Sequence, residues 1–225
     1  MRLDQPAGAT TAPAGLLPRP PPGVEADGAH AMTALSDLLR DVRACEACRP
    51  FLPLGPRPIV QAGSLARVLV IGQAPGSRVH ETGAPWDDAS GARLREWMGI
   101  ETATFYDPDQ VALMPMGFCY PGVSKTGGDM PPRRECAPLW HDRLRRHLPN
   151  VTLTLLVGQY AQKAYLRVGK GATLTETVRR FAQSPPGLMP LPHPSWRSTG
   201  WMRRNPWFEA ELVPALRAAV AAALR

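Results

Sequence analysis

Four cysteines are the residues of this sequence that most directly suggest chemistry. Cys45 and Cys48 form a C-x-x-C pair, 70 residues separate Cys48 from Cys119, and 16 separate Cys119 from Cys136. Four thiolates complete the ligand shell of a zinc ion or of an iron–sulfur cluster, so a single site would use every cysteine of the chain. The spacing therefore predicts a metal or cluster site, although the second pair is not C-x-x-C and fits the common zinc-ribbon pattern poorly. A redox pair, a disulfide and plain core packing are the other uses of such thiols.

Two further segments carry residues that could do chemistry. Segment 72–76 (GQAPG) follows a short apolar run, and its glycines permit a sharp turn whose amide groups can donate to an anion or a carbonyl oxygen. It lacks the lysine of a phosphate-binding nucleotide loop, which argues against ATP use. His193 lies between two prolines that restrict its backbone. Ser195, Trp196 and Arg197 follow it, and these side chains suit phosphate contacts and base stacking.

The elements that must position these segments alternate along the chain. Short apolar runs predict strands at 67–71, 110–114, 151–157 and 187–191. Helical spacing predicts helices between and around them, at 32–44, 90–98 (with Ser90 as N-cap), 133–148, 159–168, 174–182 and 205–225 (with Asn205 as N-cap). This alternation predicts an α/β fold with a parallel sheet, in which ligands bind beyond the carboxyl ends of the strands. Segment 72–76, the Gly/Pro-rich loop 115–132 and the loop that holds His193 should all lie at that edge.

Composition sets the wider expectations. The 225 residues suit one domain of ordinary size, and we expect residues 1–31, rich in Ala, Pro and Gly, to be a disordered extension of a domain at 32–225. The net charge of +7 permits a polyanionic partner. No run approaches the ~18 apolar residues of a membrane span, and the N-terminus lacks the apolar core of a secretory signal. We therefore expect a cytoplasmic protein that has no membrane partner, in a compartment where disulfides are rare.

Taken together, these motifs resemble the uracil-DNA glycosylase superfamily, and most closely its iron–sulfur family 4. GQAPG is similar to the family's GEAPG, and Gly83-Ala-Pro-Trp86, which begins seven residues after Gly76, is similar to its G-x-P-F. The cysteine spacing matches the family's cluster ligands, and His193-Pro194 matches its second catalytic motif. The resemblance covers about residues 36–220. It implies a single three-layer α/β/α domain with a short, four-stranded, mainly parallel sheet.

The resemblance also implies an activity and a role for each motif. The protein would be a monofunctional DNA glycosylase that flips uracil out of DNA and hydrolyses its N-glycosidic bond, which leaves an abasic site for base excision repair.

 
It would act in the bacterial cytoplasm, at the nucleoid, as a monomer whose partner is DNA that contains a deaminated base. The cysteines Cys45, Cys48, Cys119 and Cys136 would bind a structural 4Fe-4S cluster, with zinc as the less favoured alternative.

The resemblance assigns the remaining residues as follows. His193 would donate to the pyrimidine O2 and stabilise charge on the leaving base, and Gln73 would act with it at the catalytic site. Trp86, in the place of the family's phenylalanine, would stack on the base. The other base-contacting positions would be Gly72, Ala74, Pro75, Gly76 and Pro115, and the DNA-contacting positions would be Ser195, Trp196 and Arg197.

Three departures from the family pattern bear on the substrate. Pro115 stands where family 4 has its base-reading asparagine, Gln73 replaces a glutamate, and Ala74 stands where family 1 has its water-activating aspartate. Candidate carboxylate bases, each also suited to an ordinary loop or capping role, are Glu81, Asp87 and Asp88. These differences indicate a divergent branch. They leave open a glycosylase for hypoxanthine or xanthine, and a non-catalytic iron–sulfur protein that binds DNA.

A basic cluster surrounds the fourth cysteine, and its members are Arg133, Arg134, Arg143, Arg145, Arg146 and His147. Phosphate contact and a solvated helix face are the two interpretations of this cluster. The tryptophans Trp97, Trp140, Trp201 and Trp207 are expected to pack in or against the core.

Overall fold

The computed structural model describes residues 28–225, apart from 126, 167–168 and 170. The expected disorder of the N-terminal extension therefore concerns residues that lie mostly outside the described part of the chain. Helix α1 spans Gly28–Arg43 and so includes residues 28–31, which we had placed in the extension. Its buried side chains Leu35, Leu38, Leu39 and Val42 follow the spacing of one helix face, which packs against α5 (Cys136–Arg146).

Four parallel strands form the central sheet, in the order β2-β1-β3-β4. They are β1 (Val68–Ile71), β2 (Val111–Leu113), β3 (Leu153–Val157) and β4 (Leu188–Leu191). Every residue of β1, β2 and β3 is buried, as expected of strands covered by helices on both faces. The predicted α/β class is confirmed, and the sheet is parallel throughout.

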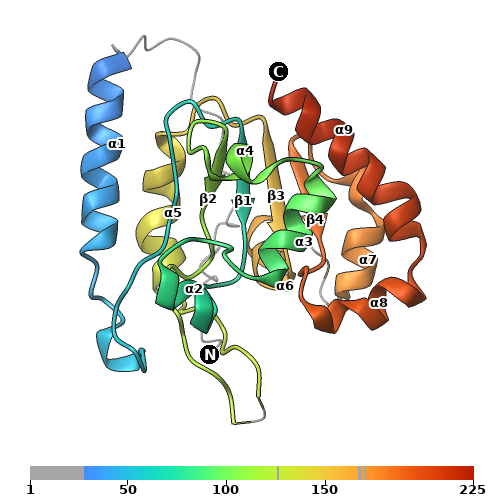
Figure 1. The fold of residues 1–225 in the computed structure, drawn as a ribbon, viewed down its shortest axis with the longest axis horizontal. Helices are drawn as coiled ribbons and strands as arrows, with labels where there is room; N and C mark the ends of the chain where they lie inside the picture. The colour runs from blue at the N-terminus through green and yellow to red at the C-terminus, as the bar shows by residue number, and fades with distance from the viewer. Residues whose placement is uncertain (1–27, 126, 167–168, 170) are drawn as a thin grey trace, which may run out of the picture.

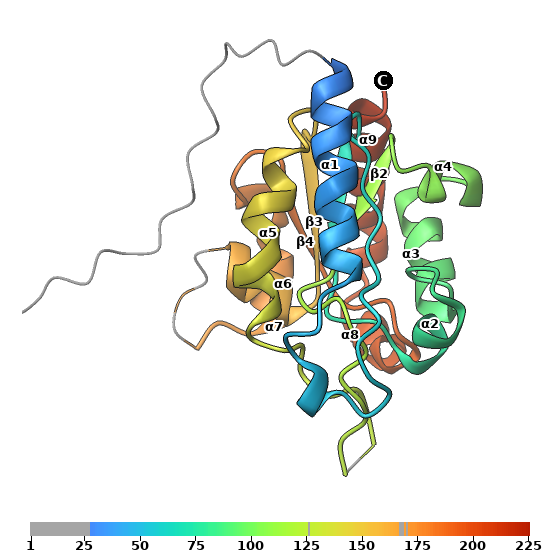
Figure 2. The same ribbon diagram turned by 90° about the vertical axis from the view of Figure 1, so that its left-hand side faces the viewer.

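Alternate residues of β1 belong to two separate cores, which makes the domain three-layered. Val68 and Val70 join a cluster built with α3 (Ala89–Met98), α4 (Thr102–Tyr106) and α9 (Val213–Ala223). Leu69 and Ile71 join a second cluster built with α1, α5 and α6 (Gln159–Tyr165). Figure 2 shows α1 and α5 on one side of the strands and α3 and α4 on the other.

The remaining helices are short. They are α2 (Ser77–Thr82), α7 (Leu174–Arg179) and α8 (Thr199–Arg204). Helix α2 forms in a stretch between the predicted strand 67–71 and the predicted helix 90–98, where we expected no helix. No helix in the described part of the chain combines the length and the apolar character that crossing a membrane requires.

One predicted helix cap was wrong, and one predicted helix is irregular. Helix α3 is capped by Asp88, whose Oδ1 accepts from the Gly91 N–H at 2.7 Å, and not by Ser90. The helix expected over 205–225 is interrupted, because a π-helical turn at Phe208–Leu212 precedes α9. Pro214 explains the interruption, since a proline at the start of α9 has no N–H for the α-helical bond to the preceding turn. Asn205 therefore caps no regular α-helix.

Candidate active site

The loops after β1 and β2 are joined at the carboxyl edge of the sheet. Gly72, directly after β1, accepts a hydrogen bond from the Met116 N–H at 2.9 Å, and the Gln73 carbonyl accepts one from the Gly117 N–H at 3.0 Å. These two bonds use donors of the 115–132 loop. Segment 72–76 then leads into α2, whose N-cap is Gly76. The first two of the three predicted loops therefore form one continuous wall.

Trp86 rests against this wall in a constrained conformation. Its φ of 58° lies in the left-handed region, which is strained for a bulky side chain. A Cβ on Gly72 would lie 2.7 Å from the indole Cζ2, so only glycine permits this approach. A Cβ on Gly91 would lie 1.8 Å from the Trp86 carbonyl oxygen. The same oxygen accepts a hydrogen bond from Arg95 Nη1 at 3.4 Å, so the surrounding structure holds the strained residue in place.

His193 completes the arrangement from the end of β4. Its ring stacks on Trp86, with centroids 5.7 Å apart and planes inclined by 27°. Burial lowers the pKa of His193 below its usual value, and the Asp88 and Asp129 carboxylates partly oppose that shift. Because the charged form is disfavoured, the imidazole is neutral near pH 7 and presents one N–H donor.

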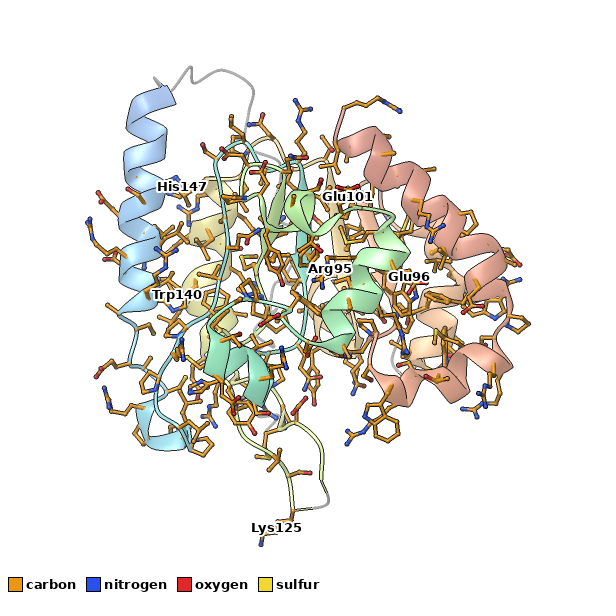
Figure 3. The ribbon with its side chains drawn as sticks, in the orientation of Figure 1. Arg95, Glu96, Glu101, Lys125, Trp140 and His147 are labelled. Atoms are coloured by element: carbon orange, nitrogen blue, oxygen red, sulfur yellow. The ribbon has the colours of Figure 1, made fainter. Side chains whose placement is uncertain are left out.

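The backbone of the His193 loop is held by two side chains. The Ser198 hydroxyl donates to the His193 carbonyl at 2.5 Å. Arg93 of α3 donates through Nη1 to the Ser195 carbonyl at 3.0 Å and to the Pro194 carbonyl at 3.4 Å. Figure 3 shows Arg95, two residues further along α3, directed toward the interior of the fold. Helix α3 therefore positions both Trp86 and the His193 loop.

The structure thus gathers Gly72, Gln73, Trp86 and His193 at one edge of the sheet. Pro75 and Pro115 are buried there, and Ala74 is half-buried. Trp196 is 76% exposed, and Arg197 lies over its ring with its guanidinium carbon 5.5 Å from the ring centroid. The roles that the resemblance assigns to these residues remain predictions.

The Gln73 side chain is tied to the 115–132 loop, because its Nε2 donates to the Met130 carbonyl at 3.2 Å. Asp88, one of the three candidate bases, serves as the helix cap described above. The Glu81 carbonyl accepts from Arg57 Nη1 at 3.0 Å, and the Asp87 carbonyl accepts from Arg78 Nε at 2.8 Å. Each of the three acidic residues therefore takes part in a hydrogen bond that holds the local structure of α2, of the loop after it or of the start of α3.

A buried pair that the sequence did not reveal supports the wall from behind. His141 Nε2 lies 3.0 Å from the Pro115 carbonyl oxygen, and its Nδ1 lies 2.6 Å from the Tyr165 hydroxyl. Since a carbonyl can only accept, Nε2 carries the proton and Nδ1 accepts from Tyr165. Burial lowers the pKa of His141 to about 4 and raises the pKa of Tyr165 to about 12. The 115–117 segment is therefore held on one side by segment 72–76 and on the other by a neutral histidine.

The four cysteines line one cavity between the residues after α1, the 115–132 loop and the start of α5. All four are free thiols, so the structure contains no disulfide among them. Burial raises the pKa of Cys119 to about 11 and that of Cys136 to about 12. No three His, Cys, Asp or Glu residues of the described chain form a group that could hold a metal ion.

The chemistry of this cavity nevertheless fits a thiolate-bound group. Cys136 Sγ accepts a hydrogen bond from the Phe118 N–H at 3.3 Å, and Arg133 hydrogen-bonds to Cys48. Donors to sulfur are typical of iron–sulfur sites. Trp140 also lines the cavity, and its buried indole N–H has no hydrogen-bond partner among the described residues.

The basic cluster near Cys136 makes mostly local contacts. Arg133 pairs with Glu135 at 2.6 Å, Arg143 lies 3.6 Å from Asp41, and Arg145 lies over the Tyr165 ring. Figure 3 places His147 at the end of α5 far from Lys125, which extends from the 115–132 loop. These positions favour a solvated helix face over a phosphate contact near Trp86 and His193. Trp97 and Trp140 are buried, and Trp201 and Trp207 pack against the core, as expected.

A comparison with known families agrees with the geometry. The family model described as the Uracil DNA glycosylase superfamily matches residues 61–217. The matched region contains the whole sheet, segment 72–76, Trp86 and His193, and it includes Cys119 and Cys136 but neither Cys45 nor Cys48. Members of this superfamily are DNA glycosylases, which hydrolyse N-glycosidic bonds. The chain therefore belongs to the uracil DNA glycosylase superfamily.

Proposed function

We propose that the protein is a monofunctional DNA glycosylase that removes uracil and leaves an abasic site, and that it represents a divergent branch near the iron–sulfur family 4. The observation that carries the proposal is the stacked pair of Trp86 and His193 against the Gly72 turn. An aromatic surface and a neutral hydrogen-bond donor then lie together at the carboxyl edge of the sheet, as excision of a planar base requires.

The reaction begins with extrusion of the nucleotide from the helix. Unstacking and unpairing cost a few kcal/mol, and the cost is smallest for a mispaired base. Trp86 offsets part of it by stacking on the extruded base, since stacking on an aromatic side chain contributes about 1–3 kcal/mol. The constrained backbone of Trp86 fixes the plane of that contact before the base arrives.

Bond cleavage leaves negative charge on the departing base. As the C1′–N1 bond breaks, the electron pair moves onto the base, water adds to C1′, and the water's proton ends on the base. His193 donates to the pyrimidine O2 and stabilises this charge. A preorganised donor of this kind contributes about 100- to 1,000-fold in rate.

Backbone donors of segment 72–76 add to this effect. Among the described residues, the N–H groups of Gln73 and Ala74 have no hydrogen-bond partner. They can therefore donate to a base carbonyl or orient the attacking water. Since Pro115 is buried, lacks an N–H and has its carbonyl bonded to His141, the base edge is read by backbone groups and not by an asparagine side chain.

The proposal also assigns the cysteine cavity. Cys45, Cys48, Cys119 and Cys136 hold a 4Fe-4S cluster, which, when bound, ties the segment after α1 to the 115–132 loop and to α5. The four thiols in the lining, the N–H donors to sulfur and the unpartnered Trp140 N–H support this assignment. The purified protein should be brown, absorb near ~400 nm and contain iron and sulfide. A colourless protein that contains zinc would overturn the cluster and leave the four-thiolate site standing.

A panel of oligonucleotides tests the activity. Each carries one modified base, in a single strand or in a duplex, and alkali cleaves any abasic site that the protein forms. We expect product from uracil opposite guanine. Abasic product from hypoxanthine or xanthine, with none from uracil, would show that uracil is not the substrate. DNA binding that persists in His193→Ala, with no abasic product at any enzyme excess, would show a non-catalytic protein.

A further inference from the structure

Residues 122–125 and 127–130 form the two arms of a β-hairpin that projects from the carboxyl edge of the sheet. The Met130 N–H donates to the Gly122 carbonyl at 2.8 Å, the Ser124 N–H donates to the Gly128 carbonyl at 2.8 Å, and Val123 pairs with Asp129 in an antiparallel bridge. Figures 1 and 2 show this hairpin extending beyond the neighbouring helices in both views. Its backbone bonds give it a defined shape.

The base of the hairpin lies against the proposed active site. The Met130 carbonyl accepts from Gln73 Nε2 at 3.2 Å, and the Asp129 carboxylate is close enough to His193 to oppose in part the lowering of its pKa by burial. A Cβ on Gly128 would lie 2.7 Å from Arg197 Nη1, so the hairpin packs closely against the loop that follows His193. The hairpin is therefore fixed both to segment 72–76 and to the loop that follows His193.

The outer surface of the hairpin combines apolar and cationic side chains. Val123 is 64% exposed and Met130 is 41% exposed, and the neighbouring Trp196 is 76% exposed. Lys125 points away from the domain, as Figure 3 shows, and Arg197, which lies against Gly128 of the hairpin, is also exposed. Proteins that bend or open a duplex use this combination, in which apolar side chains wedge between base steps while cations contact phosphates.

We propose that this hairpin contacts the undamaged strand of duplex DNA. The inference rests on the proposed function. A DNA strand held at the proposed active site would lie over His193 and the 195–197 turn. An element that projects past them would therefore reach the partner DNA strand. Val123 and Met130 pack against the bases exposed when the nucleotide leaves the stack, and Lys125 contacts a phosphate. The hairpin thereby favours duplex over single-stranded substrates.

The test compares excision of uracil from a U:G duplex and from the same single strand. The variant is Val123→Ser combined with Met130→Ser, which leaves the backbone bonds of the hairpin in place. The control is Leu65→Ser, since Leu65 is 58% exposed ahead of β1, at the opposite edge of the sheet. We expect kcat/KM on the duplex to fall about tenfold, as when two apolar side chains lose a contact surface. Single-strand excision should change by less than about twofold, within the scatter of surface substitutions.

Lys125→Ala tests the cationic contact independently. Removing one phosphate contact should make the salt dependence of duplex binding shallower by about one unit in log–log slope. Equal loss on both substrates, or duplex excision unchanged in both hairpin variants, would overturn the inference while leaving the glycosylase proposal intact. Absence of excision by the wild-type protein on every substrate would instead overturn the proposed function. In that case, if Lys125→Ala bound duplex DNA with the same salt dependence as the wild-type protein, the proposed hairpin contact would be overturned as well.

Discussion

Replacing Gly91 by alanine should destabilise the protein and displace Trp86, although alanine is usually favoured over glycine inside a helix. Alanine in a helix is normally more favourable than glycine by about 1 kcal/mol. Here the new Cβ would lie 1.8 Å from the Trp86 carbonyl oxygen and 2.7 Å from its carbonyl carbon. The contact is with backbone, so Trp86 or the start of α3 must move by about 1 Å at an overpacking cost of about 1–3 kcal/mol.

Gly200→Ala is the matched control for this substitution. Gly200 is also helical, in α8, and its Cβ would meet only Arg204 Nη1 at 3.7 Å. We expect Gly200→Ala to raise the free energy of unfolding by about 0.5–1 kcal/mol and Gly91→Ala to lower it by up to about 2 kcal/mol. A shift of Trp86 relative to His193 of about 1 Å should also slow uracil excision by about 100-fold.

Two assays separate these effects. Urea unfolding followed by circular dichroism gives the two stabilities, and single-turnover excision of uracil gives the two rates. The reasoning would be refuted if Gly91→Ala were as stable and as active as Gly200→Ala. Lost stability with an unchanged rate would show that the position of Trp86 does not control the reaction.

Two other substitutions test the supports of the site. Because folding lowers the pKa of His141 to about 4, the unfolded chain binds a proton more readily, and stability should fall by up to about 3 kcal/mol as the pH falls from about 6.5 to about 4. His141→Phe should flatten this part of the profile of unfolding free energy against pH, and an unchanged slope would contradict the assignment. Arg93→Ala removes the bonds to the Pro194 and Ser195 carbonyls and should lower kcat about tenfold, with a loss of stability of only about 1–2 kcal/mol. A kcat equal to that of the wild type would show that Arg93 does not position the His193 loop.

The order of strands and helices could be predicted because strands that are buried on both faces are short apolar runs, which are easily recognised in the sequence. The runs at β1 and β2 are apolar throughout, and the glycine or proline that soon follows each strand marks the edge where ligands bind. The meeting of segment 72–76 with His193 follows from that topology. The spacing of the four cysteines also predicted that they would lie together. They line one cavity although 70 residues separate Cys48 from Cys119.

Other features depend on contacts that have no local signal. Asp88 and Ser90 are both good N-caps, and only the packing of Trp86 over Gly91 selects Asp88. The left-handed backbone of Trp86 runs against the preference of its own side chain. The bonds of His141 to Tyr165 and Pro115 join residues 24 and 26 positions apart, and they form because the helices and the loop share one face of the sheet.

The most direct test of the central claim is the single-turnover rate of uracil release by His193→Ala beside the wild-type protein, on a U:G duplex at saturating enzyme. A neutral donor that stabilises the leaving base predicts release by the wild-type protein and a rate about 100- to 1,000-fold lower in the variant, with DNA affinity retained. Equal rates in the two proteins would contradict the account, because the stacked histidine would then have no part in breaking the bond.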